Sequence, residues 1–531
     1  MSVQATYDVR IDLNGSRVFS DANENVSDDW KRMTWRLGVG KPFDALARAA
    51  SCEIVLNNAD GRFSPEHGSG LAGFRPGALV RIRTTYDGAT RQHFIGWIAP
   101  GGIRPAPGTR GKRETVVQAQ GWLSRIQDVE VTLEVQEGKR TDEVILALMQ
   151  AANVYPPGTM GWLLGLPGST SLGETTRLST GFSDFTDLDA GATILNYAGD
   201  NWEEGVSVYG ALRDVVAAEG EGALLYVDRE GKLIFRSRHW PHGDMYNAGD
   251  ATLTQSDIKE GGLDYGYGGR IVNDVTVGLR PRTVTGSESS KVTLGTIDRA
   301  LRVDPGESET TRIRYDDGSG ERIGGKSVEI GDYTATANQD GSGADLTSQV
   351  SAAITEEGGT SATVEFTNGS SRPAFIQPGA SVKGVKITDF GKQEITHADE
   401  DSILAYGRQK ECLQLSLLDD TRFAESLAEG LVYLRKEPMG EIAAVTMVAN
   451  KSDSLMQQAL ARTIGDRIQL SEGQTGASGE YFIVGEQHQV NGQRHHLVTW
   501  TLRPAFETLL WVFGGVGDDY PGLGEETRLG F

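Results

Sequence analysis

Short apolar runs separated by turn residues dominate the first part of the chain and predict β-strands. Between Ser51 and Ile98 such runs occur at 52–56, 78–84 and 93–98. The middle run alternates apolar and charged residues, which is typical of a half-buried strand. Asp-Gly pairs in this stretch tolerate the positive φ that tight strand connections need. The stretch is therefore predicted to be a compact antiparallel β unit, and nothing in it indicates a reaction centre.

The alternation continues on both sides of this stretch. Tyr7 to Leu13 alternates strictly and ends at Asn14-Gly15, which is a strong hairpin signal. The segments 115–122 and 129–135 have the pattern of further strands. Residues 1–136 are therefore predicted to form one β-barrel-like domain.

Helical spacing replaces the alternation after residue 136. A helix is predicted to begin with Thr141 as its N-cap, followed by an apolar stripe made of Val144, Ile145, Leu148, Met149 and Ala152. A second helix is predicted from near Ser207 to Gly220, followed by a hairpin that turns at 228–231. Residues 137–263 are thus predicted to form a small α+β domain.

Strand patterns return in two blocks, 264–300 and 391–510, which are predicted to form a second β-barrel-like domain. The second block also contains a helical pattern from about Thr421 to Lys436, with apolar residues four positions apart. Pro438 then ends this helix, because proline cannot continue one.

The residues between the two blocks, 301–390, are rich in Gly, Ser and Thr and carry short alternating runs. This pattern predicts an inserted β-sandwich. The last segment, 511–531, is rich in Gly and acidic residues and is predicted to be a flexible C-terminal tail or partner-binding extension. The predicted fold class is mainly β with α+β insertions.

Length and charge narrow the classes of function. A chain of 531 residues is expected to form three or four domains. The formal net charge is −22 and the pI is about 4.9, which excludes a basic groove that grips nucleic acid. Such a surface repels a polyanion and so suits a wall past which DNA slides. The alternative, that the acidity only keeps a large protein soluble, stays open.

The two cysteines, Cys52 and Cys412, lie in apolar strand-like runs. Both are expected to be buried thiols, and without histidines at suitable spacing they do not indicate a structural zinc site. Met1 to Tyr7 has neither a basic nor an apolar signal region, and no run of about 20 apolar residues occurs. We therefore expect synthesis in a cytoplasm and no membrane-spanning helix.

Two patterns raise the question of a metal site. His495-His496 is the one paired histidine, but adjacent strand residues point to opposite faces, so a hairpin turn is the preferred interpretation. Residues 316–321 place carboxylates in a glycine-rich loop, as calcium ligands often are. Their spacing does not match the twelve-residue calcium loop, so a solvated turn is preferred there and calcium stays open. No metal, cofactor or catalytic residue is assigned.

Two acidic pairs resemble catalytic carboxylates, and one glycine-rich run resembles a phosphate-binding loop. Glu203-Glu204 and Glu356-Glu357 do not specify carboxylates that face each other across a cleft, so surface positions are preferred. Residues 265–269 lack the strand–GxGxxG–helix context and a following Lys-Ser/Thr. There is no GxSxG or HExxH motif. The apolar loop 162–167, which begins with a tryptophan, is either a partner contact or a buried loop.

Several motifs, in a fixed order, resemble one protein family. They are "LNNADGRFSP", "RPGALVRIRTTYDG" and "FIGWI" near the N-terminus, then "TDEVILAL" and "GALLYVDREGKLIFRSR". An N-x-V-x-V strand follows at Asn273, and "IGDRIQL", "YFIVGEQH" and "VTWTLRPA" complete the set. Together they resemble the tail-tip or baseplate hub family of bacteriophage tails and related contractile injection systems. The insertion and the last twenty residues lie outside this resemblance.

The resemblance implies a structural protein and no enzyme. It implies two tube-like β-barrel hub domains side by side, with three chains in a homotrimeric, pseudo-sixfold ring. The ring would cap the tail tube at the distal end of the virion tail and form part of the DNA ejection channel. The implied partners are the tail tube or distal tail protein, the tape-measure protein, and tip fibres or a spike. Synthesis would take place in the host cytoplasm.

Two other classes of function were considered. A tail-associated cell-wall hydrolase would need a paired-carboxylate or zinc signature in a separate domain, and the sequence shows neither. A host-surface carbohydrate-binding protein would use the predicted sandwich, and glycan sites usually cluster aromatic residues. In this segment the aromatic residues are spread out, at Tyr315, Tyr333, Phe366, Phe375 and Phe390.

Overall fold

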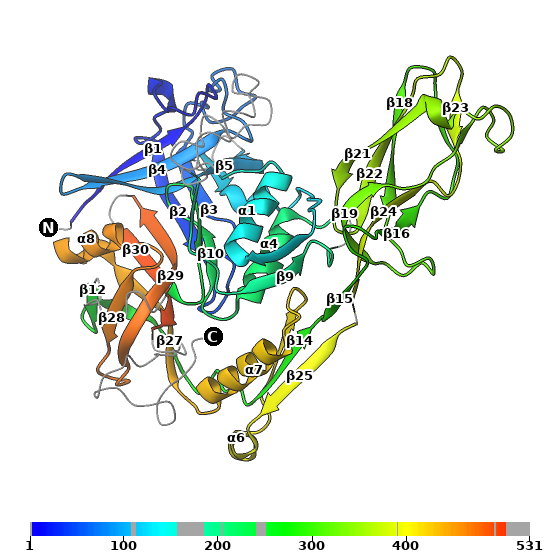
Figure 1. Ribbon diagram of the computed structural model, residues 1–531. Coiled ribbons are helices and arrows are strands. Elements are labelled where there is room, and N and C mark those ends of the chain that lie inside the picture. Colours follow the sequence, from blue (N-terminus) through cyan, green and yellow to red (C-terminus); the bar gives the residue numbers. More distant parts are fainter. Residues whose placement is uncertain are drawn as a thin grey trace.

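The computed structural model confirms a mainly β chain (Figure 1). The residues that the structure describes are 3–107, 113–156, 185–202, 205–240, 251–389, 391–492 and 495–505. Among them no helix is long and apolar enough to cross a membrane.

One 12-stranded sheet carries most of the N-terminal and C-terminal strands. Its main path runs, in spatial order, through β1 (Thr6–Ile11), β4 (Leu79–Tyr86), β5 (Ala89–Pro105), β6 (Glu114–Gln120), β3 (Ser51–Asn57), β2 (Trp30–Gly38), β29 (Ser478–Asn491), β30 (His495–Pro504), β27 (Gly440–Val448) and β13 (Ile258–Tyr267). Two more strands branch from β29, namely β28 (Arg467–Ser471) and β12 (Ala251–Thr254).

The predicted pair of separate barrels is not confirmed. Strands β2 and β29 pair antiparallel from Arg32 opposite Asn491 to Gly38 opposite Gly485, so both halves of the chain share one sheet. Pairing satisfies the backbone groups that two separate sheet edges would have left open. Among the described residues the sheet path is open, with β1 at one end and β13 at the other.

A helical layer packs against this sheet (Figure 1). Its helices and short strands are β7 (Gln136–Arg140), α1 (Thr141–Ala151), β8 (Thr186–Leu188), β9 (Ile194–Ala198), α4 (Val208–Glu219), β10 (Leu224–Val227) and β11 (Leu233–Arg236). Helix α4 begins next to Ser207 as predicted, and the Ser207 side chain caps it by accepting a hydrogen bond from the Gly210 amide. Thr141 does not cap α1: it is buried as the first helical residue, and its hydroxyl donates to Glu219 at 2.6 Å.

A separate three-stranded sheet consists of β25 (Gln393–Ala398), β14 (Asp274–Leu279) and β26 (Lys410–Leu415). The predicted strand near 271–277 therefore pairs here and not in the large sheet. Helix α7 (Thr421–Arg435) packs on β14 and β25, and the Asp420 side chain caps its first turn. The short helix α6 (Glu400–Tyr406) connects β25 to β26, and α8 (Asp453–Ala461) lies between β27 and β28 in sequence. Short 3₁₀ turns occupy η1 (Ala22–Glu24), η2 (Trp122–Ser124), η4 (Thr347–Gln349) and η5 (Ala449–Lys451).

The segment from β15 to β24, called the inserted unit below, has its own hydrophobic core from Leu294 to Val382. It extends away from the rest of the molecule (Figure 1). Its strands are β15 (Arg282–Thr285), β16 (Val292–Thr296), β17 (Leu301–Val303), β18 (Ser308–Arg314), β19 (Gly324–Ile330), β20 (Ala335–Thr336), β21 (Val350–Glu357), β22 (Ser361–Asn368), β23 (Ala374–Ile376) and β24 (Ser381–Asp389).

Candidate assembly surfaces and the buried seam

A buried polar network lies on the seam where β2 pairs with β29. The Trp35 ring stacks on the His488 ring with centroids 4.7 Å apart and 9° between planes. His488 Nδ1 and His496 Nε2 share a hydrogen bond at 3.0 Å, and His496 Nδ1 is 2.9 Å from the Tyr7 hydroxyl. His93 packs beside Trp35 and His488 and is 2.7 Å from the Thr84 hydroxyl. The network therefore links strands from both halves of the chain.

A buried ion pair anchors the same network to the helical layer. Arg229, in the turn between β10 and β11, donates to Glu486 at 2.7 Å and to the main-chain carbonyls of Leu460 and Arg462. Burial alone would raise the pKa of Glu486, but Arg229 and His488 lower it to about 2. The Glu486 carboxylate is thus charged at neutral pH although its side chain is fully buried.

The histidines of the seam are held in their neutral form. Burial lowers the pKa of His93 and His496 well below the usual value of 6.5, and the nearby Arg229 lowers the pKa of His93 further. Burial also lowers the pKa of His488, against the opposing effect of Glu486. Neutral rings can accept as well as donate, so a ring-to-ring hydrogen bond is possible in this network. The chemistry that the seam supports is structural coupling of the two halves.

Exposed apolar residues gather at a second place, called the α6–α7 corner below. Of the seven exposed large hydrophobic residues in the described part of the chain, five come from β13, α6, α7 and the segment after α7: Tyr267, Leu404, Tyr406, Tyr433 and Met439. Leu404 is 89% exposed and Tyr267 is 70% exposed. Apolar side chains grouped on a surface, with polar residues around them, are typical of protein–protein interfaces.

Hydrogen bonds hold this corner together at the end of the sheet. The Tyr406 hydroxyl donates to Glu437 at 2.9 Å, and this contact is the main reason that the pKa of Tyr406 is raised. The Gly268 amide donates to the Met439 carbonyl at 2.9 Å, directly after the last pair between β13 and β27. The corner therefore adjoins the terminal strand β13, which pairs on one side only among the described residues.

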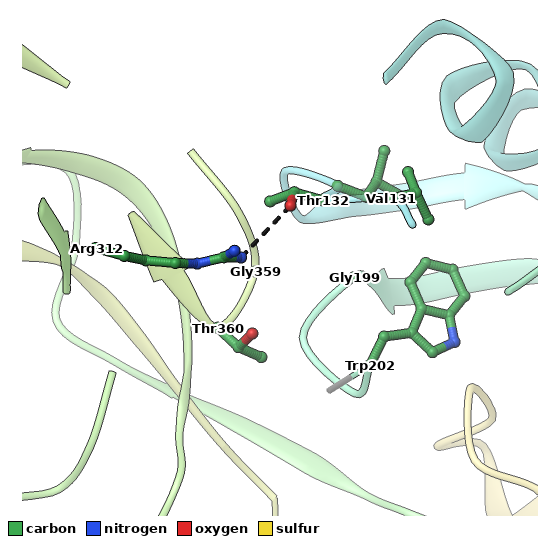
Figure 2. Close-up of a pocket in the computed structure, with 8 residues that line it drawn as sticks. Val131, Thr132, Gly199, Trp202, Arg312, Gly359 and Thr360 are labelled. Carbon is green, nitrogen blue, oxygen red and sulfur yellow. Dashed lines mark hydrogen bonds between the residues drawn. The ribbon is translucent and has the colours of Figure 1, made fainter. Parts of the chain in front are cut away.

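The junction between the inserted unit and the helical layer is closely packed. Figure 2 shows Arg312 and Gly359 of the inserted unit facing Thr132 and Gly199. The Gly359 amide donates to the Leu133 carbonyl at 2.8 Å, and Arg312 Nη2 donates to Thr132 Oγ1 at 3.4 Å. The cavity between them has a volume of about 20 Å³, which is room for about one water molecule. The junction is thus a joint and not a ligand site.

Charged pairs reinforce the joint. The Arg282 side chain donates to Asp200 at 2.6 Å, and both side chains are at most 5% exposed. Burial raises the pKa of Asp200, and Arg282 opposes that effect. Lys326 also pairs with Glu137 across the joint. A buried ion pair with good geometry fixes an orientation, because breaking it would leave a charge without a partner.

The histidine pair considered from sequence is not a hairpin turn. Both residues lie in β30, where His495 is exposed and His496 is 2% exposed. The turn interpretation was wrong because the strand begins at His495, and His496 then points into the core. Cys412 is also corrected: Cys52 is buried, but Cys412 is exposed on β26, on the strand face opposite to its neighbour Leu413.

The other candidate residues have ordinary local partners. Asp316 and Asp317 accept hydrogen bonds from amides of their own turn, and the described residues contain no group of three or more metal-ligating side chains. Glu356 accepts from Thr363, and Glu357 accepts from the Val328 amide. Outside the described residues lie Glu203-Glu204, the loop 162–167 and the tail 511–531.

Neither the seam nor the α6–α7 corner is among the sites predicted from the sequence. One signal was available for the seam: in β29, Glu486 and His488 occupy the same alternating positions as the buried Val490. A polar residue at a core position indicates a buried network. No comparable local signal marks the corner, because its residues come from segments far apart in the chain.

Comparison with known proteins finds matches among solved structures. No family model matches the sequence, and no protein of curated function matches it. The structure is similar to a tail protein from Neisseria meningitidis MC58, with a TM-score of 0.46, 10% identity, and coverage of 94% of this chain and 96% of that one. It is similar to the 43 kDa tail protein of prophage MuSo2 from Shewanella oneidensis, with a TM-score of 0.47, 7% identity, and coverage of 94% and 99%.

A third similar structure is a component of the type VI secretion system of E. coli, described as structurally similar to T4 bacteriophage tail proteins. Its TM-score is 0.34 with 7% identity, and the match covers 90% of this chain and 73% of that one. The three structures are described as tail proteins or as similar to bacteriophage tail proteins, and all three likenesses are distant, with identities of 10% or less.

Proposed function

We propose that this chain is a structural hub of a phage tail tip, which caps the tail tube, organises assembly of the tip and forms part of the channel for DNA ejection. One observation carries the proposal. The N-terminal and C-terminal strands form a single sheet, locked by the buried seam, whose path ends at β1 and at β13 without closing on itself among the described residues. A sheet with two different ends offers two different surfaces for contact with further copies.

In the proposed assembly three copies form a closed homotrimeric ring. Residues 1–136 and the blocks 264–300 and 391–510 are proposed as two similar hub domains, which together give the ring pseudo-sixfold symmetry. The α+β domain at 137–263 and the inserted β-sandwich at 301–390 are proposed to lie outside the ring wall. The rigid joint at Gly359 supports this arrangement, because it holds the inserted unit in one direction.

The proposed partners follow from a position at the distal end of the tail. They are the tail tube or distal tail protein on one face of the ring, the tape-measure protein in its channel, and tip fibres or a spike on the other face. DNA passes through the channel without specific binding, which agrees with a net charge of −22. No catalytic step is part of this function.

Electron microscopy of tails can test the proposed position. Tails assembled with the chain carrying a small epitope tag in the loop near Gly306, an exposed turn of the inserted unit, would be labelled with gold-conjugated antibody. The expected result is label at one end of each tail only. Label along the whole tube, or tails that form normally without the chain, would contradict the proposal.

A further inference from the structure

The two ends of the 12-stranded sheet carry opposite charge. We infer that the arginine-rich face at the β1–β4 end of one copy docks onto the acidic β13 edge of a second copy, head to tail. The inference rests on the proposed function and specifies which surfaces close the ring. Its evidence is the composition, the packing and the geometry of the two ends.

The basic end is called the arginine face and consists of Arg10, Arg17, Arg83 and Arg125 around the buried Arg81, whose side chain is 11% exposed. Two carboxylates, Asp8 and Asp12, lie among these five arginines, so the formal charge of the face is +3. This patch is an exception in a chain whose total charge is −22. An acidic surface is therefore the complementary partner for it.

Cross-strand register brings the arginines together. Arg10 lies directly opposite Arg81 in the pairing of β1 with β4, and Asp8 lies opposite Arg83. Like charges in direct cross-strand positions are destabilising, and Asp8 alone bridges both Arg10 and Arg81. The positive charge is thus only partly neutralised within one copy.

Aromatic rings fix the positions of two of these arginines. The Arg81 guanidinium lies 4.5 Å from the centre of the Phe19 ring, and the Arg125 guanidinium lies 4.0 Å from the centre of the Trp97 ring. Val18, beside Phe19, is 63% exposed. The face therefore combines arginines that are positioned by aromatic rings with an exposed apolar residue, a combination enriched at protein interfaces.

The acidic end is called the β13 edge and has the opposite composition. It carries two lysines, Lys259 and Lys451, and five carboxylates, so its formal charge is −3. The carboxylates are Asp257, Glu260, Asp264, Glu437 and Glu441. Asp264 is exposed in the middle of β13, and the exposed Tyr267 follows on the same strand. This edge is continuous with the apolar α6–α7 corner.

The two ends complement each other in charge and in apolar character, and they belong to different surfaces of one chain. A contact between different surfaces of identical chains is heterologous, and such contacts form a ring when the rotation closes. The segment 25–27 already bonds to the outer edge of β1, so side chains of the arginine face, and not new backbone pairing there, make the contact.

Charge reversal on the full-length chain tests this contact. R83E reverses a charge on the arginine face, D264R reverses one on the β13 edge, and R302E is the control on the distant inserted unit, where the side chain is 59% exposed. Mass photometry would measure the concentration at which rings dissociate at an ionic strength of about 0.1 M. Each single reversal is expected to raise this dissociation concentration about tenfold or more, and R302E is expected to leave it unchanged.

The double variant R83E/D264R tests whether residues 83 and 264 face each other across the contact, because only a direct pair again joins opposite charges in that variant. With such a pair it is expected to form rings within about threefold of the unmodified chain. Far-UV circular dichroism checks folding, and R17E replaces R83E if that variant does not fold.

The outcomes separate this inference from the proposed function. If the unmodified chain forms rings and the single reversals form them equally well, the head-to-tail contact is refuted while the ring stands. If the unmodified chain stays monomeric throughout, the ring itself is refuted. A raised dissociation concentration in both single variants, with recovery in the double variant, supports the contact between the two ends.

Discussion

Removing Arg229 should destabilise the seam more than any loss of a surface charge would. In R229M the Glu486 carboxylate stays buried but loses the guanidinium that donates to it at 2.7 Å. The carbonyls of Leu460 and Arg462 lose their donor as well. Because the Glu486 side chain is 0% exposed and that of Arg229 is 10% exposed, solvent screening is weak. Breaking a buried pair of this kind costs about 3–5 kcal/mol.

The loss of stability in R229M should depend on pH, because it involves the ionisation of Glu486. In the unmodified chain the pKa of Glu486 is about 2, below its ordinary value of 4.5. The contribution of Glu486 to stability is therefore fully present above pH 4.5 and is lost as the pH falls toward 2. In R229M burial is no longer opposed by Arg229, so the pKa of Glu486 rises. The difference in stability between R229M and the unmodified chain should then narrow as the pH falls.

Hydrogen exchange at the β29 amides is the direct assay, because it reports the free energy of opening of that part of the sheet. R229M should lower this free energy by about 3–5 kcal/mol, and the double variant R229M/E486L should recover much of the loss. R302M, at an exposed arginine, is the matched control and should stay within about 0.5 kcal/mol. Equal protection of β29 in R229M and the unmodified chain would refute the role of the ion pair.

Three further perturbations test other parts of the structure. V80D places a charge at a residue that is 0% exposed, so it should unfold the N-terminal strands, as measured by circular dichroism, and abolish assembly. V18D, at an exposed valine, is the control and should fold. Because the pKa values of the three seam histidines are lowered, stability should fall below about pH 6.5, by about 1.4 kcal/mol per pH unit for each histidine at full effect. H496Q should reduce the slope of unfolding free energy against pH in this range. An unchanged slope in H496Q, or an equal reduction in H495Q, would contradict the role of His496. G359A would place a Cβ 2.4 Å from the Gly199 backbone, so it should shift the inserted unit, as measured by small-angle scattering, while leaving rings intact. G68A is the control, because a Cβ there meets no atom within 4 Å. An unshifted inserted unit in G359A would contradict the rigid joint.

Local elements were predictable from the sequence because their signals are local. The α4 helix is capped at Ser207 by a side-chain contact three residues away, and α7 begins after Asp420 in the same way. The strands of the N-terminal unit follow alternation, so β4 has Val80 and Ile82 buried as the pattern requires. These features depend only on neighbouring residues.

Long-range pairing was not predictable in the same way. Strand β2 pairs with β29, more than four hundred residues later, and no local pattern specifies which open edge a strand joins. The prediction of two β-barrel domains side by side is not confirmed, because strands of both blocks share this single sheet. His496 and Cys412 were misjudged for a related reason, since the side of a strand that becomes buried depends on what packs against it.

The charge pattern of the sheet ends shows a similar limit. Arg10 and Arg81 are seventy-one positions apart in sequence and become opposite neighbours only through the β1–β4 register. The net charge of −22 predicts an acidic surface, whereas the structure concentrates positive charge at one end of the sheet. Composition therefore indicated the sign of the whole surface but not its distribution.

The ring is the central claim, and the mass of the purified full-length chain tests it most directly. Mass photometry across a concentration series, with negative-stain images of the same sample, should show three copies of the 57.2 kDa chain in a closed ring with a central channel. A single species of one chain mass at every concentration, with no rings in the images, would contradict the account.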